Sequence, residues 1–306
     1  MNRAIRATAM AVLCCTVGGA GLLGCEESPE ADPGAAPATA SSTTAGDAGE
    51  GPFSGTGKMT VDGRSVNVSC SGRAADDRPV VVLMAGAGDG LTRVAGLQKA
   101  LSEKERVCSY DRLGEGASDK PDGPRSMDDS GRVLTAVLDR VAGDGPVVLA
   151  GHSLGGLVAA RYAPDHQDRV AGLVLMDATI PNLNAGLSKA IPEPATGPGA
   201  ELRAQFAAMS QGQNPERLVI ADAKVRSAGD IPVQIVKHES QYAAVPEHGP
   251  ALEKMWTEGQ REWLALSSRS ELSTAAGTGH YIYEDRPDLA LEAIQDVTAR
   301  AADGKR

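Results

Sequence analysis

Short apolar runs alternate with helical patterns from residue 80 to the end of the chain, and this alternation restricts the fold more than any other feature. The runs are rich in β-branched residues and are continuous, which is typical of strands buried on both faces. They lie at residues 80–84, 107–110, 146–150, 170–176, 231–236 and, more weakly, 271–275. Helical patterns lie at 92–103, 126–141, 154–163, 252–267 and 287–301. The alternation predicts an α/β fold with a largely parallel sheet.

Two further segments complete the predicted fold. Asp62-Gly63 lies in the middle of residues 59–68, and this turn sequence predicts an opening β-hairpin. Residues 178–229 interrupt the alternation with an insertion that is too long for a plain crossover. The insertion has weak helical patterns at 200–209 and 215–228, so we interpret it as a helical cap placed over a site.

The first residues have the form of an export signal. Arg3 and Arg6 precede an uncharged apolar stretch that ends in Leu22-Leu23-Gly24-Cys25. The stretch is short and rich in glycine for a membrane span, and its end is similar to the bacterial lipobox, whose cysteine becomes lipidated. We therefore predict a signal peptide over residues 1–24 and a lipid anchor on Cys25, which places the protein on the extracytoplasmic side of the cell membrane. An ordinary signal, with Cys25 incidental, is the alternative.

The segment after the signal differs sharply from the rest of the chain. Residues 25–54 consist mainly of Pro, Ala, Ser, Thr and Gly without an apolar period, so beyond Cys25 we expect a disordered linker. One globular domain then occupies residues 55–306. Its two cysteines, Cys70 and Cys108, are a candidate disulfide in an oxidising compartment, with two buried free thiols as the alternative.

A Gly-x-Ser-x-Gly pattern marks the strongest candidate for a catalytic residue. Gly151-His152-Ser153-Leu154-Gly155-Gly156 joins the 146–150 strand to the helix that follows it. At such a turn the backbone is strained, small residues must flank the serine, and the hydroxyl projects at the helix N-terminus. We therefore predict that Ser153 is a nucleophile.

A nucleophilic serine needs a base, and His280 is the best placed of the five histidines. Gly279-His280-Tyr281 follows the last predicted strand, at a C-terminal strand end, where α/β sites form. His152 lies inside the turn and is expected to point away from the site. Of the other histidines, His166 lies in a polar stretch, His238 ends a predicted strand and His248 lies in a loop.

Two carboxylates compete for the role of the acid that orients His280. Asp177 follows the 170–176 strand and Glu239 follows the 231–236 strand, so both belong to C-terminal strand ends. We favour Asp177, because a shorter side chain directly at a strand end is better fixed for orienting an imidazole. Glu239 remains the alternative acid.

Two backbone amides are predicted to hold the oxyanion. The first belongs to Leu154, the residue after the nucleophile. The second belongs to Ala87, in the loop 85–90 that follows the 80–84 strand. The small residues of this loop let the backbone approach a substrate closely.

Together, these segments resemble the α/β-hydrolase superfamily. The resemblance rests on residues 83–88, 110–119, 151–156, 170–177, 279–282 and 285–287, and it extends from Val80 to about Ile294. It implies an eight-stranded, mostly parallel sheet with helices on both faces, and a Ser–acid–His triad in that order along the chain. Ser153, Asp177 and His280 obey this order.

The superfamily carries the triad acid at either of two places. Some members, certain haloalkane dehalogenases among them, have it after the sixth strand, where Asp177 falls. Others have it after the seventh, where Glu239 falls. The family's strand order also implies that the Cys108 strand lies beside the Cys70 strand, which favours a disulfide.

The chain departs from the family pattern at two points. Ala85-Gly86 stands where His-Gly is usual, so a side chain that often orders the oxyanion loop is missing, although the backbone donors survive. The nucleophile is serine rather than aspartate, which argues against epoxide hydrolase or dehalogenase chemistry. We interpret Asp111 and Arg112 as structural residues that hold the loops beside the site.

Composition argues against several other functions. The chain has 40 Asp and Glu against 30 Lys and Arg, a net charge of −10, which is unfavourable for nucleic-acid binding. It has no Cys/His spacing typical of a metal site and no dinucleotide fingerprint, so we expect neither metal nor organic cofactor. We predict a monomeric, esterase-like serine hydrolase that acts on an ester-like bond of a small-molecule substrate. Cleavage of amide, peptide, lactone or thioester bonds on the same triad and a non-catalytic surface binding module are the alternatives.

Overall fold

The computed structural model describes residues 53–75, 78–245 and 247–304. The chain divides into two units, residues 1–46 and 47–306, and only the second contains described residues. The predicted signal peptide, Cys25 and the predicted linker up to residue 52 lie outside the described residues. No helix in the described ranges is both long enough and apolar enough to cross a lipid bilayer.

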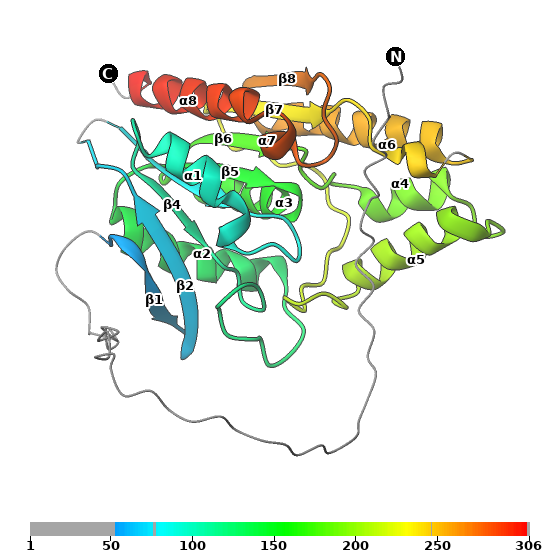
Figure 1. The fold of residues 1–306 in the computed structure, drawn as a ribbon, viewed down its shortest axis with the longest axis horizontal. Coiled ribbons are helices and arrows are strands. Elements are labelled where there is room, and N and C mark those ends of the chain that lie inside the picture. The colour runs from blue at the N-terminus through cyan, green and yellow to red at the C-terminus, as the bar shows by residue number, and fades with distance from the viewer. Residues whose placement is uncertain (1–52, 76–77, 246, 305–306) are drawn as a thin grey trace, which may run out of the picture. The chain divides into compact units, whose positions relative to one another are not determined.

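One eight-stranded sheet forms the centre of the described unit, in the order β1-β2-β4-β3-β5-β6-β7-β8 (Figure 1). Its strands are β1 Gly55–Val61, β2 Arg64–Ser71, β3 Val80–Met84, β4 Val107–Tyr110, β5 Val147–His152, β6 Val170–Met176, β7 Pro232–His238 and β8 Arg269–Ala275. The β1–β2 and β2–β4 pairs are antiparallel and the other pairs are parallel. The predicted eight-stranded, mostly parallel sheet is confirmed, and every predicted apolar run is a strand.

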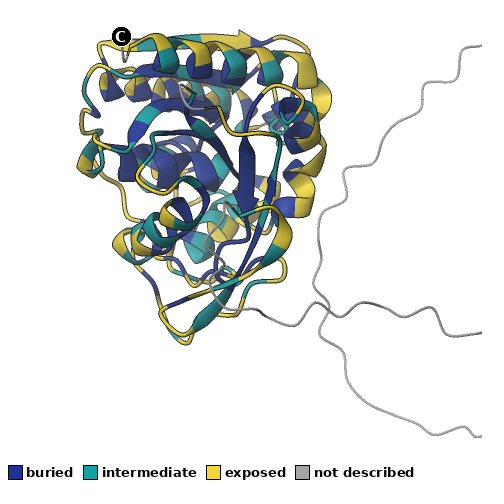
Figure 2. Ribbon diagram, turned by 90° about the vertical axis from the view of Figure 1, so that its left-hand side faces the viewer, coloured by how far each residue is buried: buried dark blue, intermediate teal, exposed yellow. Residues whose placement is uncertain are grey.

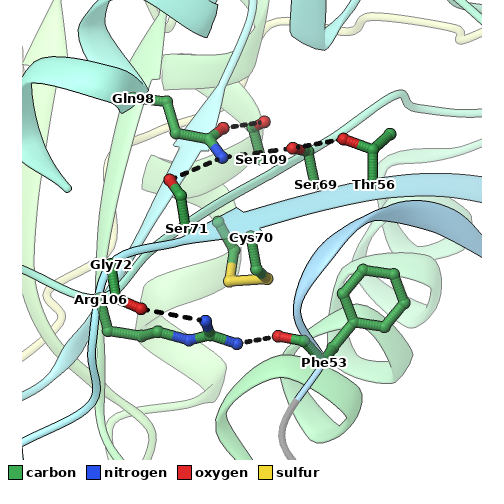
Figure 3. The surroundings of a disulfide bond; sticks show 10 residues. Phe53, Thr56, Ser69, Cys70, Ser71, Gly72, Gln98, Arg106 and Ser109 are labelled. Carbon is green, nitrogen blue, oxygen red and sulfur yellow. Dashed lines mark hydrogen bonds between the residues drawn. A yellow bond between two sulfur atoms is a disulfide. The ribbon is translucent and has the colours of Figure 1, made fainter.

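The chain enters the sheet through the predicted hairpin. Asp62 and Gly63 at its turn both have positive φ, 49° and 75°, the conformation that Asp-Gly favours in two-residue hairpins. β2 then pairs with β4 in a register that places Cys70 opposite Cys108. A disulfide joins these two residues (Figure 3), so the predicted pairing is confirmed.

A glutamine ties the same two strands to the helix that covers them. Gln98 belongs to α1 (Ala95–Leu101), and its Nε2 donates to Ser69 Oγ at 3.3 Å and to Ser71 Oγ at 3.2 Å (Figure 3). Its Oε1 accepts a hydrogen bond from Ser109 Oγ of β4 at 2.5 Å. The antiparallel end of the sheet is therefore held by both covalent and polar links.

Helices cover both faces of the sheet, as the resemblance implies. Strand side chains such as Val82 and Leu149 pack toward α2 (Met127–Ala142) and α3 (Ser153–Tyr162). Their neighbours on the opposite face pack toward α1 and α8 (Pro287–Asp303). Figure 2 shows the result: the central strands are buried, and the exposed residues lie mainly on the outer sides of helices and in loops.

The first half of the 178–229 insertion is helical. It contains α4 (Leu183–Ala190) and α5 (Gly197–Ser210), and α5 includes the helix predicted at 200–209. These helices share a small apolar core with α6 (Gly249–Glu262). The short helix α7 (Ile282–Asp285) precedes α8.

The second helix predicted in the insertion, at 215–228, is wrong. This segment is not helical: it begins in a turn at residues 215–216 and has no regular helix or strand beyond it. We call residues 216–228 the strap. Glu216, Leu218 and Ile220 are buried, while Arg217 and Val219 between them are exposed. The strap is held at Arg125, whose N–H donates to Arg217 O and whose carbonyl accepts from Val219 N–H, both at 2.8 Å. A period of two is the pattern of extended chain, and here it overrides the weak helical pattern.

Candidate active site

The predicted serine lies on a sharp turn between β5 and α3. Ser153 has a φ of 49°, a left-handed conformation that costs a non-glycine residue about 1–3 kcal/mol. Steric crowding requires glycine at the neighbouring positions. A Cβ at Gly151 would overlap Gly156, and one at Gly155 would overlap the Met84 carbonyl. The strained turn therefore exists because close packing on both sides of Ser153 enforces it.

The C-terminal strand ends bring the predicted base and acid together. Ser153 follows β5, Asp177 follows β6 and His280 follows β8, and these parallel strands end at the same edge of the sheet. His280 Nδ1 lies 2.6 Å from Asp177 Oδ2, and 27% of the His280 side chain is exposed. This bond leaves Nε2 of His280 as the nitrogen able to accept a proton. Within the described residues Ser153 Oγ is not hydrogen-bonded to His280, a contact that often tightens only in the substrate complex.

Asp177, rather than Glu239, contacts the histidine. Asp177 is fully buried and its own φ is 46°. Burial opposes its ionisation, but hydrogen bonds from His238 and His280 outweigh burial and hold the pKa of the carboxyl well below its usual range. Glu239 is exposed, and its Oε2 accepts a hydrogen bond from Gly277 N–H at 2.8 Å.

His238 belongs to this site, although the sequence analysis assigned it only to a strand end. Its Nδ1 lies 2.7 Å from Asp177 Oδ2, and its Nε2 lies 2.8 Å from Glu253 Oε2 of α6. The Trp256 indole of the same helix donates to Asp177 Oδ1 at 2.8 Å. Glu239 was considered because it follows a C-terminal strand end, and His238 lies at the same strand end. Side chains alternate along a strand, so His238 is buried and Glu239 is exposed.

His152 corrects a second expectation. Its side chain was expected to point away from the site, but its ring centroid lies 4.5 Å from that of His280. His152 Nε2 lies 3.0 Å from the His280 carbonyl oxygen, to which it can donate. Burial and the nearby His280 lower the pKa of His152 to about 3. A neutral His152 therefore supports the backbone of the proposed base.

The two predicted oxyanion donors lie at the start of α3 and in the loop after β3. Leu154 N–H belongs to the first turn of α3, where amides have no partner within the helix. Ala87 N–H belongs to the same peptide unit as the Gly86 carbonyl. Because that unit is planar, whatever holds the carbonyl also sets the direction of the amide.

A buried ion pair holds this loop, which we call the oxyanion loop (residues 85–90). Arg112 donates to Ala85 O at 2.6 Å and to Gly86 O at 2.8 Å. The same guanidinium makes two hydrogen bonds to Glu216 of the strap, at 2.9 and 2.8 Å. Burial opposes the charge of Arg112, but Glu216 outweighs it and raises the pKa of Arg112 above its usual value. Arg112 thus holds the loop beside the site, as expected from the sequence. Its partner Glu216 was not expected.

Two further carboxylates support the same loops. Glu115 Oε1 accepts a hydrogen bond from Gly88 N–H at 2.8 Å. Burial raises the pKa of Glu115 to about 7, with a further contribution from nearby Glu216. Asp111 accepts from Leu91 N–H at 2.5 Å and from Ala117 N–H at 2.8 Å. Asp111 therefore has the structural surroundings expected of it.

Asp177, His238 and His280 are also the one group of potential metal ligands found within the described ranges. Both Nδ1 atoms lie at hydrogen-bond distance from the same carboxylate oxygen, 2.7 and 2.6 Å. Two ligands that lie about 2 Å from one tetrahedral ion are about 3.3 Å apart, farther than either of these contacts. The two contacts are hydrogen bonds, and binding an ion in this geometry would require both rings to move.

Comparison with known proteins identifies the same architecture. A sequence model of the family described as "alpha/beta hydrolase fold" matches residues 79–261. Lipase LipV of Mycobacterium tuberculosis is 43% identical over 74 residues, which cover 24% of this chain and 28% of that protein. The chain spans less than half the length of the curated relatives it matches.

Solved structures agree on the fold. An enol-lactonase from Burkholderia xenovorans LB400 has a TM-score of 0.55 at 19% identity, over 79% of this chain and all of that one (100%). The carboxylesterase CesB of Bacillus subtilis has a TM-score of 0.56 at 16% identity, over 80% of this chain and 91% of that one. At these identities the likeness concerns the fold alone.

Proposed function

The chain belongs to the α/β-hydrolase fold family, and we propose that it is a serine hydrolase that cleaves an ester-like bond of a small molecule. The observation that carries the proposal is the 2.6 Å hydrogen bond between His280 and buried Asp177, at the sheet edge where Ser153 occupies its strained turn. An esterase, a lactonase and a lipase are among the proteins similar to the chain, which supports the same reaction class.

In the proposed mechanism each residue has one role. His280 Nε2 takes the proton of the Ser153 hydroxyl as the oxygen attacks the carbonyl carbon of the substrate. Asp177 holds the imidazole in the correct tautomer and stabilises the imidazolium that forms. The amides of Leu154 and Ala87 hold the negative oxygen of the tetrahedral intermediate. His280 then protonates the leaving group, and water, activated by the same histidine, hydrolyses the acyl-enzyme.

Fluorophosphonate labelling tests the nucleophile. The wild-type protein is expected to be labelled at Ser153, and Ser153→Ala to remain unlabelled at an unchanged melting temperature. A folded wild-type protein that resists labelling would contradict the proposal and favour a non-catalytic binding module. Rates on matched esters, lactones, thioesters and amides then rank the bond type, with the ester expected to react fastest.

We also propose that the protein is exported and anchored to the membrane through Cys25, with the folded unit on the extracytoplasmic side. The Cys70–Cys108 disulfide supports this location, because such bonds persist mainly in oxidising compartments. Metabolic labelling with a radioactive fatty acid is expected to mark the full chain but not Cys25→Ala. Equal labelling of the two chains would contradict the anchor.

A further inference from the structure

The proposed triad acid is shared between two imidazoles. Asp177 Oδ2 accepts from Nδ1 of His280 at 2.6 Å and from Nδ1 of His238 at 2.7 Å. Its Oδ1 accepts from the backbone N–H of His238 at 3.1 Å and from the indole of Trp256 at 2.8 Å. A triad needs only the first of these bonds, so the contacts with His238 require a separate explanation.

His238 is held between two carboxylates. Its Nε2 lies 2.8 Å from Glu253 Oε2, and Glu253 Oε1 accepts from the backbone N–H groups of Gln241 and Tyr242 at 2.6 and 2.8 Å. An ionised carboxylate can only accept a hydrogen bond, so both nitrogens of His238 must donate and the ring must carry a positive charge. Burial opposes that charge, but Asp177 and Glu253 outweigh it and raise the pKa of His238.

No other described side chain hydrogen-bonds the His238 ring. The ammonium of the neighbouring Lys237 donates to the His238 carbonyl oxygen at 2.8 Å. The Tyr242 ring lies 6.1 Å away, and burial raises the pKa of its hydroxyl, so it stays neutral. Trp256 lies 6.0 Å away and does not titrate. His280 lies on the other side of the shared Asp177 oxygen, and nitrogens of the two rings are within 4.8 Å of each other.

We propose that His238 is a resident imidazolium, with Glu253 as its counter-ion, and that it is a positioning residue for the triad. It fixes the orientation of Asp177, and its positive charge disfavours a second positive charge across the shared oxygen. Acylation of Ser153 should therefore continue to lower pH than it would beside Asp177 and Glu253 alone. This inference rests on the proposed function, because it assigns His280 the role of base.

Counting charges shows how the idea can be tested. With His238 charged, Asp177, His238 and Glu253 together present one net negative charge to His280. Replacing His238 by a neutral residue leaves two negative charges, which favour protonation of His280 more strongly. Replacing Glu253 as well returns the total to one net negative charge. The double variant should therefore restore the pH dependence that the single His238 variant has lost, which a purely structural role does not predict.

The experiment measures the fluorophosphonate labelling rate of the full chain against pH for four proteins: wild type, His238→Asn, Glu253→Gln and the double variant. Asparagine retains an N–H donor for Asp177 without the charge. The midpoint is the pH at which the labelling rate has fallen to half of its maximum on the acid side. We expect His238→Asn to move this midpoint up by about one pH unit, the usual effect of a nearby charge. On the steep part of the curve, labelling is then about tenfold slower at a given pH. Glu253→Gln should move the midpoint down or leave it unchanged, and the double variant should return it close to wild type.

The outcomes separate this inference from the proposed function. A wild-type protein that is not labelled overturns the proposed function itself. Normal labelling of the wild type, with an unmoved midpoint in His238→Asn or with a double variant shifted further than the single one, overturns only the role of His238.

Nuclear magnetic resonance gives a second test that needs no variant and no activity. In protein labelled with ¹⁵N-histidine, His238 is expected to show two protonated ring nitrogens at pH 7. A neutral tautomer with one bare nitrogen overturns the proposal, whether or not the variants fold.

Discussion

Two largely buried clusters of charge contact the candidate active site, and they reach it in different ways. The acid cluster of Asp177, His238 and Glu253 contacts the proposed base directly, through side-chain atoms. The loop cluster of Arg112 and Glu216 contacts only the backbone of the oxyanion loop, at two carbonyl groups. The acid cluster is built on strand ends and α6, whereas the loop cluster depends on the strap.

This difference separates two properties of the proposed enzyme. In the proposed scheme the acid cluster orients His280 and sets the charge around it, so damage to it should appear as a change in pH dependence or as loss of the oriented base. The loop cluster sets where the Ala87 amide points, so damage to it should lower the rate at every pH. The same kind of interaction, a buried ion pair, thus serves proton transfer in one place and geometry in the other.

The largest expected effect tests the centre of the acid cluster. Asp177→Asn should lower kcat/KM by about 10⁴-fold, because the amide no longer holds His280 in the tautomer that accepts the serine proton. Glu239→Gln is the matched control, and its exposed side chain should leave the rate within about twofold of wild type. A larger loss in the control than in Asp177→Asn would transfer the role of acid to Glu239.

The next effect tests the loop cluster. Lysine cannot bridge two carbonyls and a carboxylate as the Arg112 guanidinium does. Arg112→Lys should therefore lower kcat by about 10²–10³-fold, the usual loss for an oxyanion donor, without moving the pH midpoint. The exposed Arg132→Lys on α2 is the control. If the midpoint moves together with the rate, the two clusters do not act separately.

Removing the disulfide should lower stability without altering either cluster. It closes a sequence separation of 38 residues, so replacing both Cys70 and Cys108 by alanine should lower the free energy of unfolding by about 2–4 kcal/mol. Because β2 and β4 lie outside both clusters, kcat and the pH midpoint should be retained below the melting temperature. Denaturant unfolding of oxidised, reduced and substituted proteins measures the first effect, and a changed midpoint in the active protein would contradict the second.

The last effect concerns Glu115, whose pKa burial raises from 4.5 to about 7. Over this interval the folded state holds a proton that the unfolded state has released, so wild-type stability should fall as the pH rises from about 4.5 to about 7. Glu115→Gln keeps an acceptor for Gly88 N–H but cannot ionise, and should remove about 2 kcal/mol of the fall between pH 5 and pH 8. Denaturant unfolding at pH 5 and pH 8 measures it, with the exposed Glu103→Gln as control. If the free energy of unfolding changes equally between pH 5 and pH 8 in Glu115→Gln and Glu103→Gln, Glu115 does not titrate in this range.

The sequence allowed the turn around Ser153 to be predicted well. The glycines around Ser153 follow from steric needs of a single turn, and the position of His280 follows from its place after the last strand. The alternative between Asp177 and Glu239 stayed open because both end neighbouring parallel strands. Deciding between them needs the strand phase: the structure buries Asp177 against the imidazoles and leaves Glu239 in solvent, bound to Gly277.

Local pattern by itself determined the parallel strands and the nucleophile turn, because each depends on residues close in sequence. The pairing of Cys70 with Cys108 followed from the strand order that the family resemblance implies. Only the tertiary structure decided that His238 lies between Asp177 and Glu253, and that the strap carries Glu216 to Arg112. These contacts join residues 61 and 104 positions apart in the chain, for His238 with Asp177 and for Glu216 with Arg112. Burial makes each charge stable only beside its partner, and no local pattern records which distant partner the fold will supply.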